Sequence, residues 1–442
     1  MANSICDTLR RSGFQALLVG GCVRDLLLGC EPADYDVTTD ATPGQVMKLF
    51  PESVAVGAQF GVIVVPRDGL KVEVATFRSD VSYSDGRHPD SVVFSRIPQE
   101  DVQRRDFTIN GLLMRHDTGE VLDFVGGQAD LKAGIIRAIG EPSRRFTEDK
   151  LRMMRAVRFA ARFGFTIDSV TFEAIRSLAT EIRQVSAERL RDELTKLLTE
   201  GAARRGFELL EETGLLRQVL PEIAAMKGVE QPPQYHPKGD VWIHTRMMLE
   251  GLPKGASPTL AWGVLLHDVG KPPTFQAASE TGDRIRFNHH VEVGVRMAEA
   301  ICKRLRFSNE DTEQILALVD HHMRFGAVEE MRASTLKKFV RLPHFEEHLA
   351  LHRLDCLSSH RHLEAYEFVK RFLAETPPEQ VRPERLLTGD DLQTLGFRPG
   401  PIFTQILGTL EDAQLEGQVR TRDEAKDFVL KKYGSGKVRE AK

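Results

Sequence analysis

The chain of 442 residues has few cysteines, no long apolar run and almost no net charge. Its five cysteines form no CxxC pair, which argues against a disulfide framework or a cysteine zinc site and favours a reduced cytoplasmic protein. No stretch approaches the roughly 18 apolar residues of a membrane helix, and the N-terminus does not resemble a signal peptide. The net charge of −4 does not indicate a uniformly basic nucleic-acid binder.

Two kinds of residue are distributed unevenly along the chain. Between Arg144 and Arg162 there are seven basic residues and two acidic ones. Twelve of the fourteen histidines lie between His236 and His362. The length suggests about three domains at ~150 residues each, and these changes in composition indicate boundaries between them.

The local patterns predict a mixed α/β region followed by helices. Up to about residue 140, short alternating or apolar runs end in glycine or Asp-Gly, whereas after Pro142 apolar residues recur every three or four positions. A linker is predicted at Gln231-Pro-Pro and Pro237-Lys-Gly. The predicted elements are strands at 16–21 and 33–40, a hairpin at 60–78 turning at Asp68-Gly69, and helices at 23–29, 144–163, 186–198 and 204–215.

The first motif combines glycines, an arginine and carboxylates. Gly20-Gly21 lies between a predicted strand and a helix, where backbone N–H groups can face an anion, and Arg24 could bind phosphate oxygens. Asp34 and Asp36 are two apart on a predicted strand, so both carboxylates should point to one side and attract a cation such as Mg²⁺. Glu73, on another predicted strand, is a candidate third carboxylate.

Three segments, the first of which contains this motif, carry a family resemblance. "LVGGCVRDLLLG…DYDVTTDATP", "RRDFTINGLL" and "EDKLRMMRAVRFAARFGF" resemble, in order and spacing, the bacterial class II tRNA nucleotidyltransferases and poly(A) polymerases. This family belongs to the nucleotidyltransferase superfamily shared with polymerase β. The resemblance implies an α/β polymerase β-like head, a helical neck, and transfer of nucleotides from triphosphates by two metal ions.

The resemblance also assigns residues to the head. Gly21 and Arg24 would hold the triphosphate, and Asp34 and Asp36 would be catalytic and bind the two Mg²⁺ ions, with Glu73 as the candidate third carboxylate. The segment "RRDFTIN", from Arg104 to Asn110, would lie near the ribose, and its Arg105 would also reach phosphate. "AERLRDEL", at 187–194, resembles a bracing helix of the family and is interpreted as structural.

Asp149 and Arg152 are the predicted base-selecting pair. Three residues apart, they would be neighbours on one helical face, where the alternative is a surface salt bridge. Cytosine and adenine each present a donor beside an acceptor, in the order that an aspartate next to an arginine can match, whereas guanine and uracil present the reverse order. A protein pair could therefore accept CTP and ATP without a template. By the resemblance, Arg155 and Arg158 should also reach the nucleotide.

The histidine-rich region has a different signature. His244, then His267-Asp268, then Asp355 match the H…HD…D order of the HD phosphohydrolases and predict a site for a divalent metal such as Mn²⁺ or Ni²⁺. His290 and the pair His321-His322 are further candidates, of which His290 and His321 are singled out. Most of the histidines near Asp355 that follow His321-His322 are expected at the surface.

These patterns together predict four regions and a function. The regions are a nucleotidyltransferase head at 1–140, a helical neck at 141–230, an HD domain at 236–372 and a helical tail at 373–442. The predicted function is template-independent addition of CCA to the 3′ end of tRNA from CTP and ATP, with an added phosphohydrolase activity and no membrane or DNA partner. The alternatives are a poly(A) polymerase, a CC- or A-adding enzyme, or a phosphohydrolase with a nucleotide-binding regulatory head.

Overall fold

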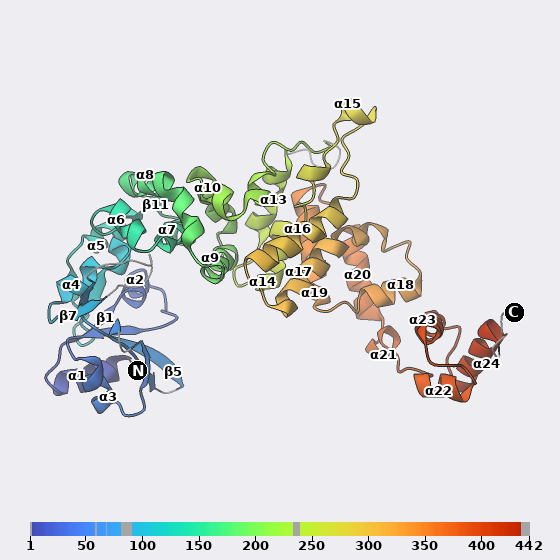
Figure 1. Cartoon of the computed structure of the whole chain (residues 1–442), viewed down its shortest axis with the longest axis horizontal. Coiled ribbons are helices and arrows are strands. Elements are labelled where there is room, and N and C mark those ends of the chain that lie inside the picture. The colour runs from blue at the N-terminus through green and yellow to red at the C-terminus, as the bar shows by residue number, and fades with distance from the viewer. Residues whose placement is uncertain (1, 58–59, 68, 81–90, 233–238, 435–442) are drawn as a thin grey trace. The chain divides into compact units, whose positions relative to one another are not determined.

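The computed structural model describes residues 2–57, 60–67, 69–80, 91–232 and 239–434, and its chain divides into two compact units. Unit 1 consists of residues 1–227 with the short segments 252–258 and 303–307, and unit 2 contains the rest (Figure 1). Most of the predicted linker at 231–239, and Asp68 of the predicted turn, lie outside the described residues. Among the described helices, none combines the length and apolar character needed to cross a bilayer.

Unit 1 begins with a seven-stranded mixed sheet. The strand order is β3-β4-β5-β2-β1-β8-β9; β2 and β5 are parallel, and every other neighbouring pair is antiparallel. Strand β1, which lies between β2 and β8, is buried along its whole length, in keeping with its apolar sequence ALLV. The strands are β1 Ala16–Val19, β2 Asp36–Thr39, β3 Val54–Gly57, β4 Val62–Arg67, β5 Leu70–Thr76, β8 Leu112–Met114 and β9 Val121–Asp123.

Smaller elements complete the head. Two short strand pairs lie outside the main sheet: β6 Arg78–Asp80 with β7 Val92–Phe94, and β10 Ile135–Ile136 with β11 Thr166–Ile167. The predicted hairpin is confirmed, because β4 and β5 pair antiparallel. The predicted strand at 33–40 is too long: β2 begins at Asp36, so Asp34 precedes it in a bend. The helices are α1 Ala2–Arg11, α2 Gly21–Leu27, α3 Pro43–Leu49, α4 Pro98–Gln103, η2 Thr108–Asn110 and α5 Gly127–Ala133.

The rest of unit 1 is almost entirely helical. The prediction of one helix over 144–163 is wrong, because Asp149 adopts an extended backbone conformation and separates α6 from α7. Helix α7 packs against α9 and α10, and α6 packs against α8. The helices are α6 Pro142–Glu148, α7 Leu151–Phe163, α8 Ser169–Leu178, η3 Ala179–Gln184, α9 Ala187–Thr199, α10 Ala203–Glu212, α11 Leu215–Val219 and α12 Pro221–Ala224.

Unit 2 is built from helices. Helix α14 is apolar on all sides and buried from Leu260 to Leu266, which makes it the core helix of the histidine-rich region. Helix α19 packs against both α13 and α17. The elements are α13 Val241–Gly251, α14 Pro258–Leu266, η4 Pro272–Thr274, α15 Ala278–Thr281, α16 His290–Arg304, α17 Asn309–His321, η5 His322–Ala327, α18 Ala333–Phe339, α19 Phe345–Ser358, α20 Glu364–Glu375 and α21 Pro378–Val381.

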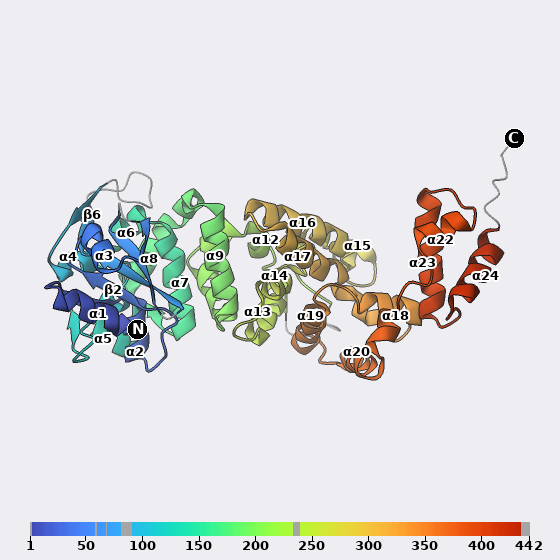
Figure 2. The same cartoon turned by 90° about the horizontal axis from the view of Figure 1, so that it is seen from below.

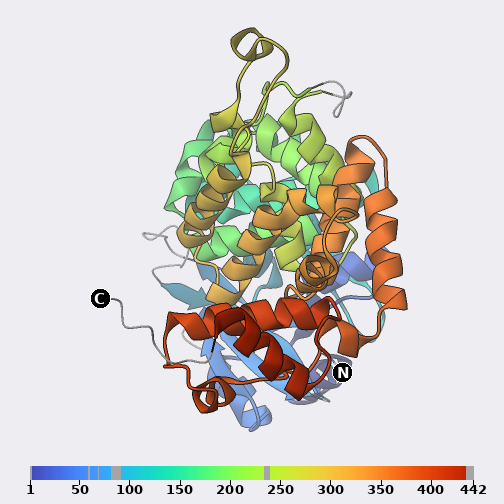
Figure 3. The ribbon, with the colours of Figure 1, turned by 90° about the vertical axis from the view of Figure 1, so that its right-hand side faces the viewer.

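The last three helices of unit 2 share a small core of their own. Helices α22 (Gly389–Thr394), α23 (Pro401–Leu415) and α24 (Arg422–Tyr433) lie together at the C-terminal end of the chain, as Figures 2 and 3 show. Leu392, Ile406 and Val429 are fully buried between them. The predicted fold class, an α/β head followed by helical regions, is therefore confirmed, while the exact division into four regions stays a prediction.

Candidate functional site

A cavity of about 660 Å³ in unit 1 collects nearly all the residues that the sequence predicted for the head. Its wall mixes eight cationic side chains with six carboxylates, a composition suited to a triphosphate and its metal ions. Glu73 is the one predicted head residue that does not line it. The predicted residues in its wall are Gly21, Arg24, Asp34, Asp36, Arg105, Asp149, Arg152, Arg155 and Arg158.

The carboxylates lie at one edge of the cavity. Asp36 begins β2 and is paired in register with Glu73 on the parallel strand β5, while Asp34 lies in the preceding bend. Burial, Glu73 and Asp34 together raise the pKa of Asp36 to about 6. Carboxylates that repel one another in this way fit the oxygen ligands that Mg²⁺ prefers.

Arg24 is a buried arginine fixed by its neighbours. Its guanidinium donates hydrogen bonds to Asp25 Oδ1 (2.8 Å) and to Asn110 Oδ1 (2.7 Å) and lies 4.6 Å from the centre of the Phe163 ring. Only 4% of the residue is exposed, and it lines the cavity. A cation held this firmly is pre-organised to bind an anion without further ordering.

Arg105 reaches the cavity from the segment after α4. Nη2 donates to Asp101 Oδ2 over 3.0 Å, and Asp101 is fully buried. A Cβ on Gly20 would lie 3.1 Å from Arg105 Nη1, and Gly20 has a φ of +77°, which favours glycine. The turn between β1 and α2 therefore favours glycine at this position mainly through its backbone conformation, and a side chain here would also press on the guanidinium of Arg105.

Asp149 and Arg152 line the same cavity but do not share a helical face. Asp149 lies in the break between α6 and α7, where its Oδ2 accepts a hydrogen bond from Arg189 Nη2 of α9 (2.7 Å). Arg152, in the first turn of α7, donates to Glu148 (2.9 Å) and to the backbone carbonyl of Arg104 (3.0 Å). The helical geometry used in the prediction is thus wrong, although both side chains reach the cavity.

Arg155 and Arg158 also line the cavity, and each is paired with a carboxylate. Arg155 donates to Asp106 Oδ2 (2.7 Å). Burial alone would raise the pKa of Asp106. The cations Arg155 and Arg152 outweigh this effect and lower the pKa to about 2. Arg158, only 5% exposed, donates to Glu193 of α9 (2.6 Å) and to Glu200 (3.1 Å).

Several residues of this cavity wall are not among those predicted from the sequence to bind the nucleotide or its metal ions. Asp106 and Asn110 belong to the segment "RRDFTIN", which the resemblance places near the ribose, but Arg105 is the only residue of that segment predicted to bind the nucleotide. Phe159 also lines the cavity, and the centre of its ring lies 5.2 Å from the guanidinium carbon of Arg24 and 4.4 Å from that of Arg158. Arg189 does not line the cavity, but it lies in the segment interpreted as a brace. No sequence signal pairs it with Asp149, because the two are 40 positions apart.

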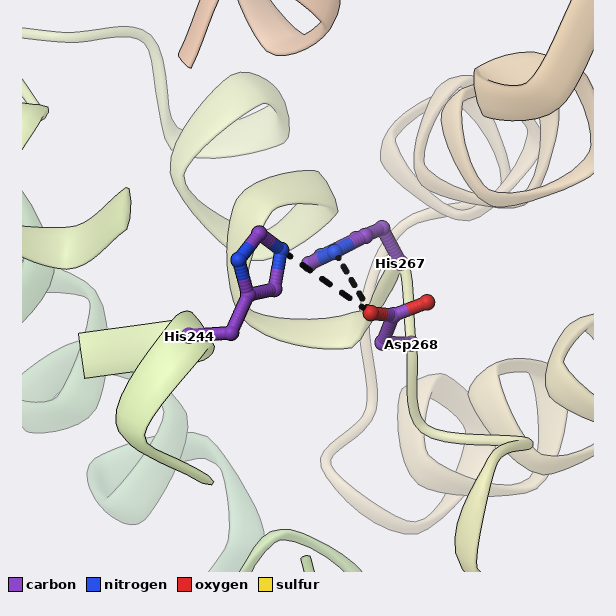
Figure 4. Close-up of side chains that lie close together, drawn as sticks. All are labelled: His244, His267 and Asp268. Atoms are coloured by element: carbon purple, nitrogen blue, oxygen red, sulfur yellow. Dashed lines mark ion pairs between the residues drawn. The ribbon is translucent and has the colours of Figure 1, made fainter. Parts of the chain in front are cut away.

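A second group of predicted residues meets in unit 2. The rings of His244 and His267 both point toward the carboxylate of Asp268 (Figure 4). Asp268 Oδ2 lies 3.2 Å from His267 Nε2 and 3.9 Å from His244 Nε2, and Asp355 Oδ1 lies 3.2 Å from His244 Nε2. The structure therefore brings the four residues of the H…HD…D pattern together.

Backbone contacts orient three of the histidines in this cluster. Nδ1 of His267 contacts the carbonyl of Val264 (2.9 Å), Nδ1 of His290 that of Phe287, and Nδ1 of His322 that of Val319. An Nδ1–H donated to a carbonyl leaves Nε2 as a lone-pair ligand, the arrangement typical of metal-binding histidines. Nε2 of both His290 and His322 is buried, with no hydrogen-bond partner in the described part of the chain, so this donor set fits a divalent metal.

The prediction that His321 joins this cluster is wrong. His321 ends α17 with its ring beside Phe339 and His348 (centroids 6.4 and 5.9 Å away). The side chain of the next residue, His322, faces the cluster instead, with its Nε2 3.9 Å from Asp268 Oδ1. One step along a helix turns a side chain by about 100°, so only one of two adjacent histidines can face the cluster.

The carboxylates and imidazoles of the cluster shift one another's pKa values. Burial alone would raise the pKa of Asp268, but His267 and Lys271 outweigh it, and the pKa lies well below its usual value. Burial alone would lower the pKa of His267, yet the adjacent Asp268 raises it. The pKa of Asp355 is likewise lowered, mainly by His244, against the effect of burial. Both carboxylates are therefore ionised at neutral pH and able to bind a cation.

A cavity of about 470 Å³ opens above the cluster. Asp268, Asp355, His290 and His322 are in its floor and wall. The other lining residues include the cations Lys271, Arg284 and Arg286 and the aromatic Phe287. Cationic groups and an aromatic ring beside a metal-ligand set can hold a phosphorylated aromatic molecule.

Three family models match consecutive parts of the chain. The model described as "Poly A polymerase head domain" matches residues 16–137. The model described as "Probable RNA and SrmB- binding site of polymerase A" matches residues 164–227, and the "HD domain" model matches residues 236–348. The HD match includes every residue of the cluster in unit 2 except Asp355.

Relatives and solved structures extend this similarity to the full chain. The CCA-adding enzyme of Levilactobacillus brevis is 34% identical over 420 residues, which cover 95% of this chain and 94% of that one. The crystal structure of the Bacillus stearothermophilus CCA-adding enzyme in complex with CTP matches with a TM-score of 0.75 at 28% identity, covering 98% and 96% of the two chains. The Thermotoga maritima CCA-adding enzyme complexed with tRNA shares the fold, with a TM-score of 0.57 at 21% identity over 98% and 94%.

Proposed function

The chain belongs to the family of CCA-adding enzymes, and we propose that the cavity in unit 1 is where it transfers CMP and AMP to the 3′ end of tRNA. The enzyme is a tRNA nucleotidyltransferase with CTP, ATP and tRNA as its substrates. The full-length similarity to CCA-adding enzymes carries this conclusion and favours it over poly(A) addition or a purely regulatory head. A cytoplasmic location is part of the proposal, in keeping with five free cysteines.

We assign the catalytic carboxylates to Asp34 and Asp36. Their oxygens would hold two Mg²⁺ ions, with Glu73 beside Asp36 on the neighbouring strand. The bound ions supply charge neutralisation at the attacking 3′-oxygen and at the leaving pyrophosphate. The raised pKa of Asp36, about 6, supports this assignment, because an arriving cation relieves the repulsion among the three carboxylates.

The triphosphate is assigned to Gly21, Arg24 and Arg105. Arg24 is buried and held by Asp25 and Asn110, so it presents its remaining N–H groups in a fixed direction. Arg105 Nε is buried without a hydrogen-bond partner in the described part of the chain, and an anion in the cavity would provide one. These cations orient the α-phosphate for attack in line with the leaving group.

Base selection is assigned to Asp149 and Arg152. Arg189 and the backbone N–H of Leu151 both hold the carboxylate of Asp149, and Glu148 holds the guanidinium of Arg152. A fixed acceptor next to a fixed donor matches the edges of cytosine and adenine, and it leaves unpaired groups against guanine and uracil. Arg155 and Arg158 contribute positive charge while anchoring α7 to Asp106 and to α9.

One assay tests this assignment directly. Purified chain is incubated with tRNA that ends before CCA, with CTP and ATP supplied separately and together. We expect two C residues with CTP alone and CCA with both nucleotides. Repeated addition of A, or addition restricted to C or to A when both are present, would contradict CCA synthesis.

A second activity is proposed for unit 2 on the strength of the histidine–aspartate cluster. His244, His267, Asp268 and Asp355 would hold a divalent transition metal such as Mn²⁺ or Ni²⁺, which supplies Lewis-acid activation of a phosphoester. The cavity of about 470 Å³ and its residues Lys271, Arg286 and Phe287 suit a nucleotide or a 2′,3′-cyclic phosphate. Hydrolysis of these compounds by the metal-loaded chain tests the proposal, and no cleavage with either metal would refute it.

A further inference from the structure

We propose that two phenylalanines of α7, Phe159 and Phe163, are positioning residues for nucleotide transfer, because their rings together hold the guanidinium of Arg24 in the wall of the nucleotide cavity. The inference rests on the proposed role of Arg24 in binding the triphosphate, and it adds the groups that fix this arginine relative to α7. Neither ring takes part in a chemical step. Both act through the arginine that they contact.

The guanidinium of Arg24 lies over both rings. Its central carbon is 5.2 Å from the centre of the Phe159 ring and 4.6 Å from that of the Phe163 ring. Both distances are within the roughly 6 Å over which a cation and an aromatic face attract one another. Arg24 belongs to α2 of the head, whereas the rings belong to α7, so these contacts join the two helices.

The two rings form a fixed pair on one face of α7. Phe159 and Phe163 are four residues apart, and their rings stack with centres 6.1 Å apart and planes 16° apart. The ring of Phe107 packs on Phe159 in a T-shaped arrangement, with the centres 5.9 Å apart. Phe159 is 5% exposed and Phe107 is fully buried. Packing therefore fixes the Phe159 ring before any ligand binds.

Arginines of α7 lie over the same rings. The guanidinium carbons of Arg155 and Arg158 are 5.1 Å and 4.4 Å from the centre of the Phe159 ring. That of Arg162 is 5.1 Å from the centre of the Phe163 ring. Like the arginine of α2, all three line the cavity in unit 1. The two rings thus contact four of the eight cationic side chains in the cavity wall.

Aromatic rings hold these cations without adding a negative charge to the site. A carboxylate also holds a guanidinium, but it repels an incoming triphosphate. Six carboxylates already lie in the cavity wall, and one of them, Asp25, is paired with Arg24. A ring face carries only the negative part of a quadrupole, so it attracts the cation and leaves the full positive charge available to phosphate oxygens.

Arg24 needs this support because it is withdrawn from water. Burial lowers the pKa of Arg24, although Asp25 opposes this effect. Arg162, whose Nη2 lies 4.0 Å from Asp25 Oδ2, brings a second positive charge close to it. The hydrogen bonds from Arg24 to Asp25 and Asn110 remain when a ring is weakened or removed. Loss of a ring should therefore weaken phosphate binding without abolishing it.

Graded fluorination of the rings tests the proposal. In the full-length chain, Phe159 or Phe163 is replaced by phenylalanine analogues with one, two and three ring fluorines. Fluorine withdraws electron density from the ring face, so the attraction for a cation falls while the shape of the ring changes little. Inorganic tripolyphosphate, which has no base, is used as an inhibitor of CTP incorporation into tRNA that ends before CCA. We expect its Ki to rise with each fluorine, reaching about tenfold with three.

CTP and ATP should respond alike, because the rings act on the binding of phosphate. The KM of each nucleotide should rise by a similar factor, while the preference for CTP over UTP should not change, since Asp149 and Arg152 are untouched. A ring that stacks on the base instead would raise the KM for a nucleotide and leave the Ki of tripolyphosphate unchanged. That outcome would overturn the proposal.

The matched control is Phe207, which is fully buried in α10. The same analogues at Phe207 should leave the Ki within about twofold of the wild type. Phe159→Leu, which removes one ring, should raise the Ki as the trifluorinated ring does. Circular dichroism checks that each chain folds, and the fluorinated chains decide the question if Phe159→Leu does not fold. A Ki independent of fluorination at Phe159 or at Phe163 would overturn the role of that ring, and an equal rise at Phe207 would overturn the proposal.

The same measurements separate this proposal from the function on which it rests. A wild-type chain that adds CCA, with a Ki for tripolyphosphate that is insensitive to fluorination of either ring, would remove the role of the rings and leave nucleotide transfer in place. A wild-type chain that adds no nucleotide to tRNA would refute both.

Discussion

Asp34 and Asp36 are the single residues on which nucleotide transfer depends most directly. Asp34→Ala or Asp36→Ala should reduce incorporation into tRNA by at least about 10²–10³-fold, the effect of removing a group that stabilises transition-state charge. The fold and tRNA binding should persist, because both residues lie at the cavity edge and not in the core. Incorporation is measured with CTP and tRNA ending before CCA. Glu52→Gln, which changes an exposed carboxylate paired with Arg67, serves as control. Substantial residual incorporation by Asp34→Ala or by Asp36→Ala would rule out the metal role of that residue.

Asp149 provides a test of specificity at the residue scale. Asp149→Ala should weaken the preference for CTP and ATP over UTP and GTP by about tenfold or more, since a hydrogen bond to a charged group contributes ~1.5–3 kcal/mol. Arg189→Ala should cause a smaller loss in the same direction, because its guanidinium holds Asp149 Oδ2. The measurement is kcat/KM for all four nucleotides, and exposed Arg183→Ala is the control. A slower enzyme with unchanged selectivity would make the Asp149–Arg189 pair purely structural.

At the scale of elements, the contact of α7 with α9 depends on a buried ion pair. The side chains of Arg158 and Glu193 are 6% and 5% exposed, and their charged atoms are 2.6 Å apart. Glu193→Ala should destabilise unit 1 by about 3 kcal/mol, the lower end of the range for breaking a buried pair, because Glu200 still contacts Arg158. Urea unfolding measures the change. Glu173→Ala, which breaks an exposed pair with Arg176, should lower the free energy of unfolding by less than about 1 kcal/mol. An equal loss of stability in Glu193→Ala and Glu173→Ala would contradict the claim that the buried pair stabilises the contact of α7 with α9.

Helix α19 should make unit 2 sensitive to acid. Most of the histidines near Asp355 are exposed, as expected, namely His344, His360 and His362. The exceptions are His348, which is 1% exposed, and His352, whose ring stacks on Phe325 at 4.3 Å. Burial lowers the pKa of each from 6.5 to about 4. Between these pH values the unfolded chain binds more protons than the folded one. The stability that the two uncharged histidines contribute is therefore fully present above about pH 6.5, and it is lost as the pH falls to about 4.

Urea unfolding of the metal-free chain at pH 7 and pH 4.5 checks this expectation. Each of these histidines should account for a loss on the order of 2–3 kcal/mol, since one pKa unit corresponds to ~1.4 kcal/mol. His348→Gln, which cannot take up a proton in this range, should show a smaller loss on acidification. The exposed His344→Gln should behave like the wild type. An unchanged pH dependence in His348→Gln would mean that other groups cause the acid sensitivity.

For the whole molecule, the two proposed activities should be separable. Every residue that lines the nucleotide cavity belongs to unit 1, and every residue of the histidine–aspartate cluster belongs to unit 2. His267→Ala combined with Asp268→Ala should therefore abolish metal binding in unit 2 and phosphoester hydrolysis, and leave CCA addition within about twofold of the wild type. Metal analysis and both assays on one preparation measure this. A large loss of CCA addition in a folded double variant would show that the two activities depend on each other.

The sequence by itself determined the kind of protein and most residues of both sites. Motifs such as "GGCVRD", "DYD" and "HD" are local, so their residues could be read in order, and Gly21, Arg24, Asp34, Asp36 and Arg105 do line one cavity. The change from alternating to helical periodicity likewise predicted the α/β head and the helical remainder. These properties depend on neighbouring residues in the chain, which periodicity and spacing record.

Only the tertiary structure decided which distant residues meet. Arg189 holds Asp149 across 40 positions, and His322, not His321, faces Asp268. The break at Asp149 was also invisible, because the apolar pattern continues through it while the backbone extends. Such features depend on how helices pack and in which direction each side chain points. A linear pattern carries little information about either, since side chains far apart in sequence are brought together only by the folded core.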